Sequence, residues 1–95
     1  MQSEDLNRLI GLRVRRRRRQ LGLTQAQLSA VCGVRFQQVQ KYESGAPLSA
    51  VRLWRIAEAL EVPIAYFFEG LPDRLADELG ARVPDRKPGE TRKRA

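Results

Sequence analysis

The chain has 95 residues, of which 42% are hydrophobic, and its formal net charge is +7. This length and composition indicate one small domain with a modest core, and the positive charge favours a polyanionic partner. A single cysteine excludes an intramolecular disulfide, and the lack of histidine excludes a Cys/His metal cage.

The first predicted helix begins near Ser3, which we expect to act as its N-cap, and ends at Gly22. Its apolar stripe consists of Leu6, Ile10, Val14 and Leu21. This helix contains a run of five arginines, Arg15 to Arg19, which on its own is also typical of a disordered polybasic arm.

The helical periodicity divides the arginine run into two groups. At about 100° per residue, Arg17 and Arg18 lie at the edges of the apolar stripe, whereas the other three arginines, Arg15, Arg16 and Arg19, point outward. The stems of the first pair can cover apolar surface while their guanidinium groups reach past it. We therefore expect the run to be part of a folded helix, with Arg16 and Arg19 as a solvated face.

The next two predicted helices are short. Thr24-Gln25-Ala26-Gln27 has the pattern of a capping box, and the helix that follows is expected to bury Leu28 and Val31 and to end at Gly33. A third helix is expected over 36–44, with Val39 and Tyr42 turned inward. Two short helices joined by a few residues that include a glycine are typical of a helix-turn-helix, whose second helix enters a DNA major groove.

Ser49 is the expected cap of a fourth helix, whose apolar face consists of Leu53, Ile56, Ala57 and Leu60. Pro63 suits the first position of a fifth helical turn, Ile64 to Phe68. No segment alternates apolar and polar residues over several positions, so we expect no sheet. The pattern predicts a DNA-binding domain over 1–70, a short helical extension over 71–80 and a disordered charged tail over 81–95.

Several spaced motifs in this chain resemble one known family. They are Ile10-Gly11-x-Arg13-Val14-Arg15-x-x-Arg18, Gly22-Leu23-Thr24-Gln25, Gly33-Val34, Glu43-x-Gly45 and Leu53-x-x-Ile56-Ala57-x-Ala59-Leu60-x-Val62. Their spacing resembles that of the Cro/phage-repressor helix-turn-helix regulators, also called xenobiotic-response-element regulators, over residues 9–69. The resemblance implies an all-α, five-helix, lambda-repressor-like bundle that binds double-stranded DNA operators, usually as a dimer.

The third helix supplies the expected base contacts. With Val39 and Tyr42 inward, its polar side chains are free to reach a groove, where glutamine pairs with adenine and lysine with guanine or phosphate. Phe36 either presses on a thymine methyl group or packs at the start of the helix. The expected base-contacting residues are Arg35, Phe36, Gln37, Gln40 and Lys41.

The resemblance also assigns phosphate contacts and an ion pair. Gln25 matches a family glutamine that binds backbone phosphate, and Arg18 matches an arginine that pairs with the glutamate at position 43. In some relatives that glutamine also bonds a glutamine at the position that Phe36 occupies here, which Phe36 cannot do. The expected phosphate contacts are Arg15, Arg17, Thr24, Gln25, Gln38 and Ser44, and the expected ion pair joins Arg18 to Glu43.

Apolar residues near the end of the domain exceed what a small bundle buries alone, so we expect a homodimer. The expected dimerisation residues are Tyr66, Phe67, Phe68, Leu71, Leu75 and Leu79. There are two alternatives to a DNA-binding regulator. One is an antitoxin that sequesters a toxin partner through the C-terminal segment, and the other is an RNA- or membrane-binding polybasic peptide.

No constellation of residues suggests an enzyme or a cofactor. No apolar run reaches the roughly 20 residues that span a bilayer, so we expect the chain to be cytoplasmic.

Overall fold

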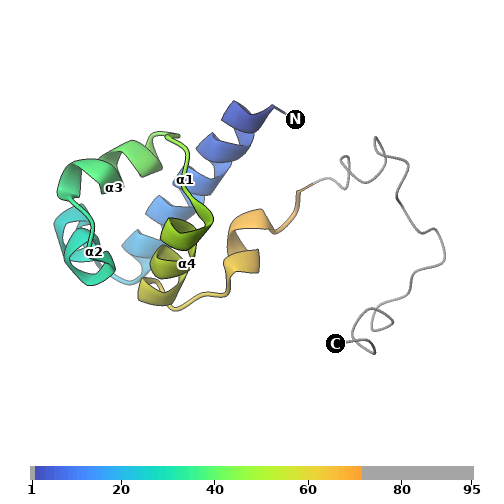
Figure 1. Ribbon diagram of the computed structural model, residues 1–95. Helices are drawn as coiled ribbons and strands as arrows, with labels where there is room; N and C mark the ends of the chain where they lie inside the picture. Colours follow the sequence, from blue (N-terminus) through green and yellow to red (C-terminus); the bar gives the residue numbers. More distant parts are fainter. Residues whose placement is uncertain (1, 72–95) are drawn as a thin grey trace.

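The computed structural model of the protein describes residues 2–71, which form four α-helices and one 3₁₀-helix (Figure 1). In chain order these are α1 (Ser3–Gln20), α2 (Gln25–Cys32), α3 (Phe36–Glu43), α4 (Ala50–Ala59) and η1 (Ile64–Phe68). The described residues contain no β-strand, as expected. Apart from Leu71, the predicted helix over 71–80, with Leu75 and Leu79, and the predicted tail over 81–95 lie outside the described residues.

Helix α1 is the long element of the bundle, and it packs against α3 and η1. The expected N-cap was wrong by one residue: Gln2 is the cap, and its backbone N–H donates to the Asp5 carboxylate at 3.4 Å. Asp5 also suits this end of the helix electrostatically, because a negative charge in the first turn interacts favourably with the helix dipole. The helix ends where Gly22 adopts a left-handed conformation, with φ of 73°.

Helices α2 and α3 are joined by a turn of three residues. The predicted capping box is present: the Thr24 hydroxyl accepts from the Gln27 N–H at 3.0 Å, and the Gln27 amide accepts from the Thr24 N–H at 2.8 Å. Gly33 ends α2 with φ of 71°, a conformation that glycine adopts without steric cost. This turn allows the two helices to cross steeply, as a helix-turn-helix requires.

The buried face of α2 differs from the prediction at one position. Leu28 is fully buried as expected, but Val31 is 64% exposed and Cys32 faces the core instead. With Ser29 also buried, the inward face is centred close to Cys32, and Val31 lies about 100° away from that centre. Cys32 therefore serves as a small hydrophobe, and burial raises the pKa of its thiol while the charge of Arg52 lowers it.

Helix α4 and η1 complete the core. Ser49 caps α4 by accepting from the Arg52 N–H at 3.1 Å, and the four predicted apolar residues of α4 are all buried. The expected fifth α-helix is a single 3₁₀ turn, in which the Tyr66 N–H donates to the Pro63 carbonyl at 2.9 Å. Five residues rich in β-branched and aromatic side chains are too few to sustain α-helical bonding.

Phe67 of η1 is fully buried, so its assignment to a dimer surface was wrong. Its ring meets that of Tyr66 edge to face, with the centroids 5.3 Å apart. Tyr66, Phe68 and Leu71 are half-buried, and the two aromatic residues pack against the core. The aromatic residues that suggested a surplus of apolar surface are thus largely part of the bundle itself. No helix within residues 2–71 is both long and apolar enough to cross a membrane.

Candidate nucleic-acid interface

Helix α3 presents one polar face to solvent. Val39 and Tyr42 anchor it in the core, and Glu43 is also buried. All five expected base-contacting residues are exposed, and four of them are polar: Arg35, Gln37, Gln40 and Lys41. None of these four makes a side-chain hydrogen bond within the described residues. The face is therefore free to bind a ligand rather than engaged in holding the fold.

The N-terminal end of α3 carries an unusual pair of residues. Arg35 occupies the N-cap position and makes no side-chain cap bond, as expected for a group that has only donors. Phe36 follows it and is 41% exposed, which leaves part of its ring open to solvent. The positive end of α3 thus has an arginine and an aromatic ring beside it. An anion could bind the arginine and the helix end, and an apolar base edge could pack on the ring.

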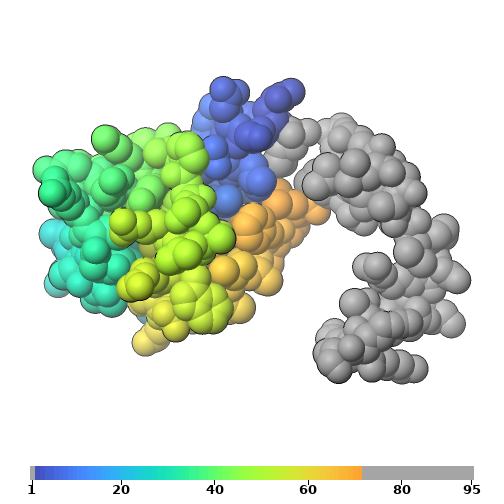
Figure 2. Space-filling model, in the orientation of Figure 1, coloured from blue at the N-terminus to red at the C-terminus, as the bar shows by residue number. Residues whose placement is uncertain are grey.

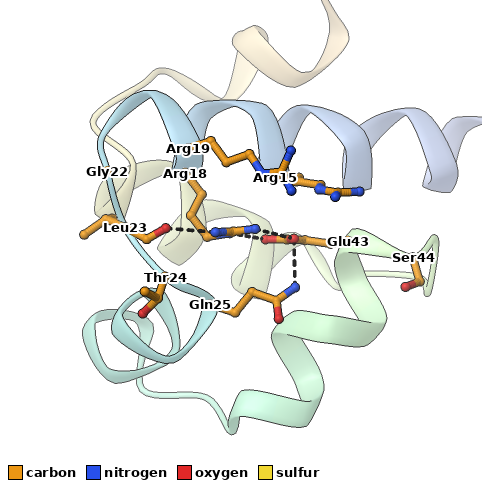
Figure 3. Close-up of a pocket in the computed structure, with 9 residues that line it drawn as sticks. All are labelled: Arg15, Arg18, Arg19, Gly22, Leu23, Thr24, Gln25, Glu43 and Ser44. Atoms are coloured by element: carbon orange, nitrogen blue, oxygen red, sulfur yellow. Dashed lines mark hydrogen bonds and ion pairs between the residues drawn. The ribbon is translucent and has the colours of Figure 1, made fainter.

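A buried network holds α3 in place (Figure 3). The predicted pair is present: Arg18 Nε donates to Glu43 Oε2 at 2.7 Å, and Arg18 Nη2 donates to Glu43 Oε1 at 3.0 Å. Arg18 Nη1 donates in addition to the Leu23 carbonyl at 2.8 Å. The side chains of Arg18 and Glu43 are only 9% and 4% exposed, so α1 is fixed to the end of α3 by a desolvated, bidentate pair.

Gln25 is the third member of this network. Its Nε2 donates to Glu43 Oε1 at 3.0 Å, which links the first turn of α2 to the last turn of α3. In some relatives this glutamine is held by a hydrogen bond to a glutamine at the position of Phe36, which cannot form that bond. In the structure Glu43 is the hydrogen-bond partner that holds Gln25, and Figure 3 shows the side chain of Gln25 extending from α2 to that carboxylate.

An open pocket of ≈ 530 Å³ lies beside this network, between the end of α1, the start of α2 and the end of α3. Four of the expected phosphate-contacting residues line it together: Arg15, Thr24, Gln25 and Ser44. Arg19 also lines it, although the sequence predicted only a solvated face at that residue. The sequence does indicate this position for Arg19, because Arg15 and Arg19 are four residues apart and therefore lie on one face of the helix.

The positive charge of the pocket has two sources. Arg15 and Arg19 are both exposed and lie along the near side of α1 in Figure 3. The first N–H groups of α2 have no partner within the helix, and the helix dipole adds a partial positive charge at the same place. Guanidinium groups and free N–H groups at a helix N-terminus are the donors that bind phosphate.

Two arginines of the same helix are committed elsewhere. Arg17 Nε donates to the Leu60 carbonyl at 2.9 Å, which caps the C-terminal end of α4. Arg13 Nη1 donates to the Tyr66 carbonyl at 3.3 Å, a contact that nothing in the sequence indicated. Gln38 is half-buried and does not line the pocket. We therefore leave Arg17 and Gln38 out of the phosphate site proposed below.

Two short helices joined by a three-residue turn, with a polar face on the second helix, are the features of a helix-turn-helix domain. A helix-turn-helix family profile matches residues 14–67, and the chain belongs to this family, of the Cro/phage-repressor type.

Two relatives are named as regulators. The chain is 52% identical over 77 residues to the HTH-type transcriptional regulator y4aM of Sinorhizobium fredii, covering 80% of this chain and 53% of that protein. It is 56% identical over 63 residues to a transcriptional regulator in the ATPase CF(0) region of Rhodospirillum rubrum, covering 65% of this chain and 58% of that protein. The chain thus spans little more than half of the length of these curated relatives.

A solved structure has the same fold. The restriction-modification controller protein C.AhdI from Aeromonas hydrophila superposes with a TM-score of 0.64 at 31% sequence identity. The match covers 67% of this chain and 97% of the controller protein. The helical core described above therefore corresponds to nearly the whole of that controller protein.

Proposed function

We propose that this protein is a sequence-specific transcriptional regulator that inserts α3 into the major groove of double-stranded DNA. The observation that carries the proposal is the position of an uncommitted polar face on α3 directly beside the cationic pocket. A duplex needs both kinds of contact, because phosphate contacts set the register and base contacts select the sequence. The membership in a family of named regulators supports the same proposal.

The chemistry of the face limits the bases that it can read. Gln37 and Gln40 each present an amide that can bond bidentately to adenine N6 and N7, and Lys41 presents donors for guanine O6 and N7. Arg35 can take a guanine or a phosphate, and the exposed edge of Phe36 fits the methyl group of thymine. We propose these five residues as the base contacts.

The pocket supplies the phosphate contacts. Arg15 and Arg19 contribute charge, and the Thr24 and Ser44 hydroxyls and the Gln25 amide contribute hydrogen bonds from two other elements. Because Gln25 is held by Glu43, its amide is already oriented before DNA arrives. Such contacts raise affinity for any duplex and make it dependent on salt.

Replacing Gln37 with alanine tests the reading role of α3. We expect Gln37→Ala to reduce the preference for operator over random DNA by about 1–3 kcal/mol, while affinity for random DNA changes little. Fluorescence anisotropy with labelled operator and scrambled duplexes at one salt concentration measures both affinities. Equal weakening on the two duplexes would show that Gln37 does not read a base.

Replacing Arg15 with alanine tests the phosphate pocket. Arg15→Ala should weaken operator and random DNA nearly equally and reduce the slope of log K against log salt by about 1. Arg16→Ala is the matched control, because it removes the same charge from a neighbouring exposed residue that does not line the pocket. An equal change of slope in both variants would contradict a localised phosphate site.

We further propose that two copies bind a palindromic operator, since a two-fold dimer places its recognition helices in successive major grooves about 34 Å apart. The relatives described above are named as regulators, and they give the toxin–antitoxin alternative no support.

A further inference from the structure

We propose that the outer face of α4 is the two-fold contact between two copies of this chain, an inference that rests on the dimeric regulator proposed above. The face consists of Val51, Trp54, Arg55 and Glu58, and we refer to it as the α4 ridge. Figure 2 shows the yellow-green surface of α4 open on the side turned to the viewer, with no other element over it. This surface differs from the dimer contact predicted from the sequence, which comprised η1 and the segment that follows it.

Two large apolar side chains of the α4 ridge are exposed, which supports its role as a protein contact. Val51 is 63% exposed and Trp54 is 55% exposed. They lie three residues apart, on the opposite side of the helix from the buried residues Leu53, Ile56 and Leu60. An exposed tryptophan beside a valine on a rigid helix is the kind of group that contributes most to protein–protein binding.

The charges around the ridge also support this role. Residues 50–61 hold two arginines and two glutamates, whereas α1 holds seven arginines and two acids. The α4 side of the molecule is therefore close to neutral, which suits a protein partner better than a polyanion. A near-neutral apolar face on a basic protein separates the partner contact from the DNA contact.

The order of the charges points to a second copy as the partner. In a two-fold contact the same patch meets itself, so each positive group must find a negative or aromatic group on the same ridge. Arg55 and Glu58 provide such a pair: with the helices antiparallel, Arg55 can reach Glu58 of the partner subunit or the ring of Trp54 of the partner subunit.

The other exposed apolar residues do not form an equivalent surface. Val31 is the one large apolar side chain exposed on α2, without a second beside it on that helix. Leu12 lies among Arg15, Arg16 and Arg19, where identical copies would repel each other. Phe36 belongs to the face of α3 that is proposed to meet DNA. Phe67 is fully buried, and Tyr66 and Phe68 are half-buried against the core.

The test compares Trp54→Glu with Leu12→Glu, a variant with the same change of charge at a residue of similar exposure, 52% against 55%. The mass of the full-length chain in solution is measured by analytical ultracentrifugation over a range of concentrations, after circular dichroism has established that each variant is folded. We expect Trp54→Glu to weaken self-association by about 30-fold or more, and Leu12→Glu to leave it within a few-fold of the wild type.

A charge exchange then tests the two-fold geometry. Arg55→Glu should weaken self-association because it leaves the ridge acidic in both copies, and Arg55→Glu combined with Glu58→Arg should restore most of it. No recovery in the double variant would contradict the antiparallel two-fold pairing.

Two outcomes overturn the α4 contact: a wild-type chain that stays monomeric up to roughly 1 mM, or a Trp54→Glu variant that associates as strongly as the wild type. Binding of each protein to a single half-site duplex is measured in parallel. A monomer that still binds the half-site specifically would leave the proposed function standing while the α4 contact fails. A dimer that binds no DNA would show the reverse.

Discussion

Replacing Glu43 with alanine is expected to lower the free energy of unfolding by about 3–5 kcal/mol. The substitution removes the acceptor of two Arg18 donors and leaves a guanidinium group buried without its counter-charge. It also removes the acceptor of the Gln25 amide, so three helices lose their common contact. For a domain of this size, whose total stability is of order 5–15 kcal/mol, such a loss is a large part of the whole.

A double variant separates the fold from its function. Arg18→Met combined with Glu43→Leu replaces the buried pair with apolar side chains, which usually costs little stability or even increases it. The double variant should therefore recover most of the stability that Glu43→Ala loses. It should still bind DNA more weakly than the wild type, because Gln25 has no brace and the pocket loses its fixed geometry.

Urea denaturation followed by circular dichroism gives both free energies, and the slopes should be similar because the fold is the same. If Glu43→Ala lowered the free energy of unfolding by less than about 1 kcal/mol, the value typical of an exposed ion pair, Arg18 and Glu43 would not form a buried, desolvated ion pair.

Replacing Gly11 with alanine is expected to destabilise the protein by about 2 kcal/mol or more. A Cβ atom at this position would overlap the Tyr42 carbonyl oxygen and lie 3.0 Å from the Glu43 carbonyl oxygen. Both obstacles are backbone atoms of α3, so α1 and α3 would have to move apart. The sign of the effect is informative, because glycine to alanine inside a helix ordinarily stabilises by roughly 1 kcal/mol.

Leu12→Ala on the same helix is the control for Gly11→Ala. Leu12 is 52% exposed, so this truncation should change stability by no more than about 0.5 kcal/mol. Thermal unfolding of the two variants beside the wild type measures the difference. A Gly11→Ala variant that is as stable as the wild type would mean that α1 and α3 are less closely packed than the structure places them.

Much of the fold could be predicted because its signals are local. Thr24 with Gln27, Gly33 and Ser49 mark helix ends by hydrogen bonds within a few residues, and all of them act as expected. The misplacement of Val31 and Cys32 arose where α2 is only eight residues long, because two turns do not define the direction of a buried face. The failure of η1 to form an α-helix has a similar cause, since its conformation depends on packing.

The residue types of the candidate site were predictable, and so was one pairing, Arg18 with Glu43, which the family resemblance implied. The other pairings were not. Periodicity separated the inward-leaning Arg17 and Arg18 from their neighbours, and the structure finds both at least partly buried. The periodicity could not indicate that Arg17 donates to the Leu60 carbonyl, because the direction of a side chain does not fix which distant element it contacts. The bond from Gln25 to Glu43 joins positions 18 residues apart and likewise depends on the crossing of α2 and α3.

The arginine run thus serves the fold and the proposed binding surface at once. Arg17 and Arg18 join α1 to the ends of α4 and α3, while Arg15 and Arg19 face the pocket. The same helix therefore fixes the orientation of α3 and places positive charge beside it. This arrangement explains how a polybasic sequence can lie within a compact domain.

Selection of bound sites from random duplex DNA, at a stated salt concentration, tests the central claim most directly. The proposed function predicts enrichment of a palindrome whose half-sites are centred about one helical turn apart, with adenine and guanine at positions that Gln37, Gln40 and Lys41 can reach. The Gln37→Ala variant should lose enrichment at one position of each half-site and keep the rest. Binding of the pool without enrichment of any sequence would contradict sequence-specific recognition by α3.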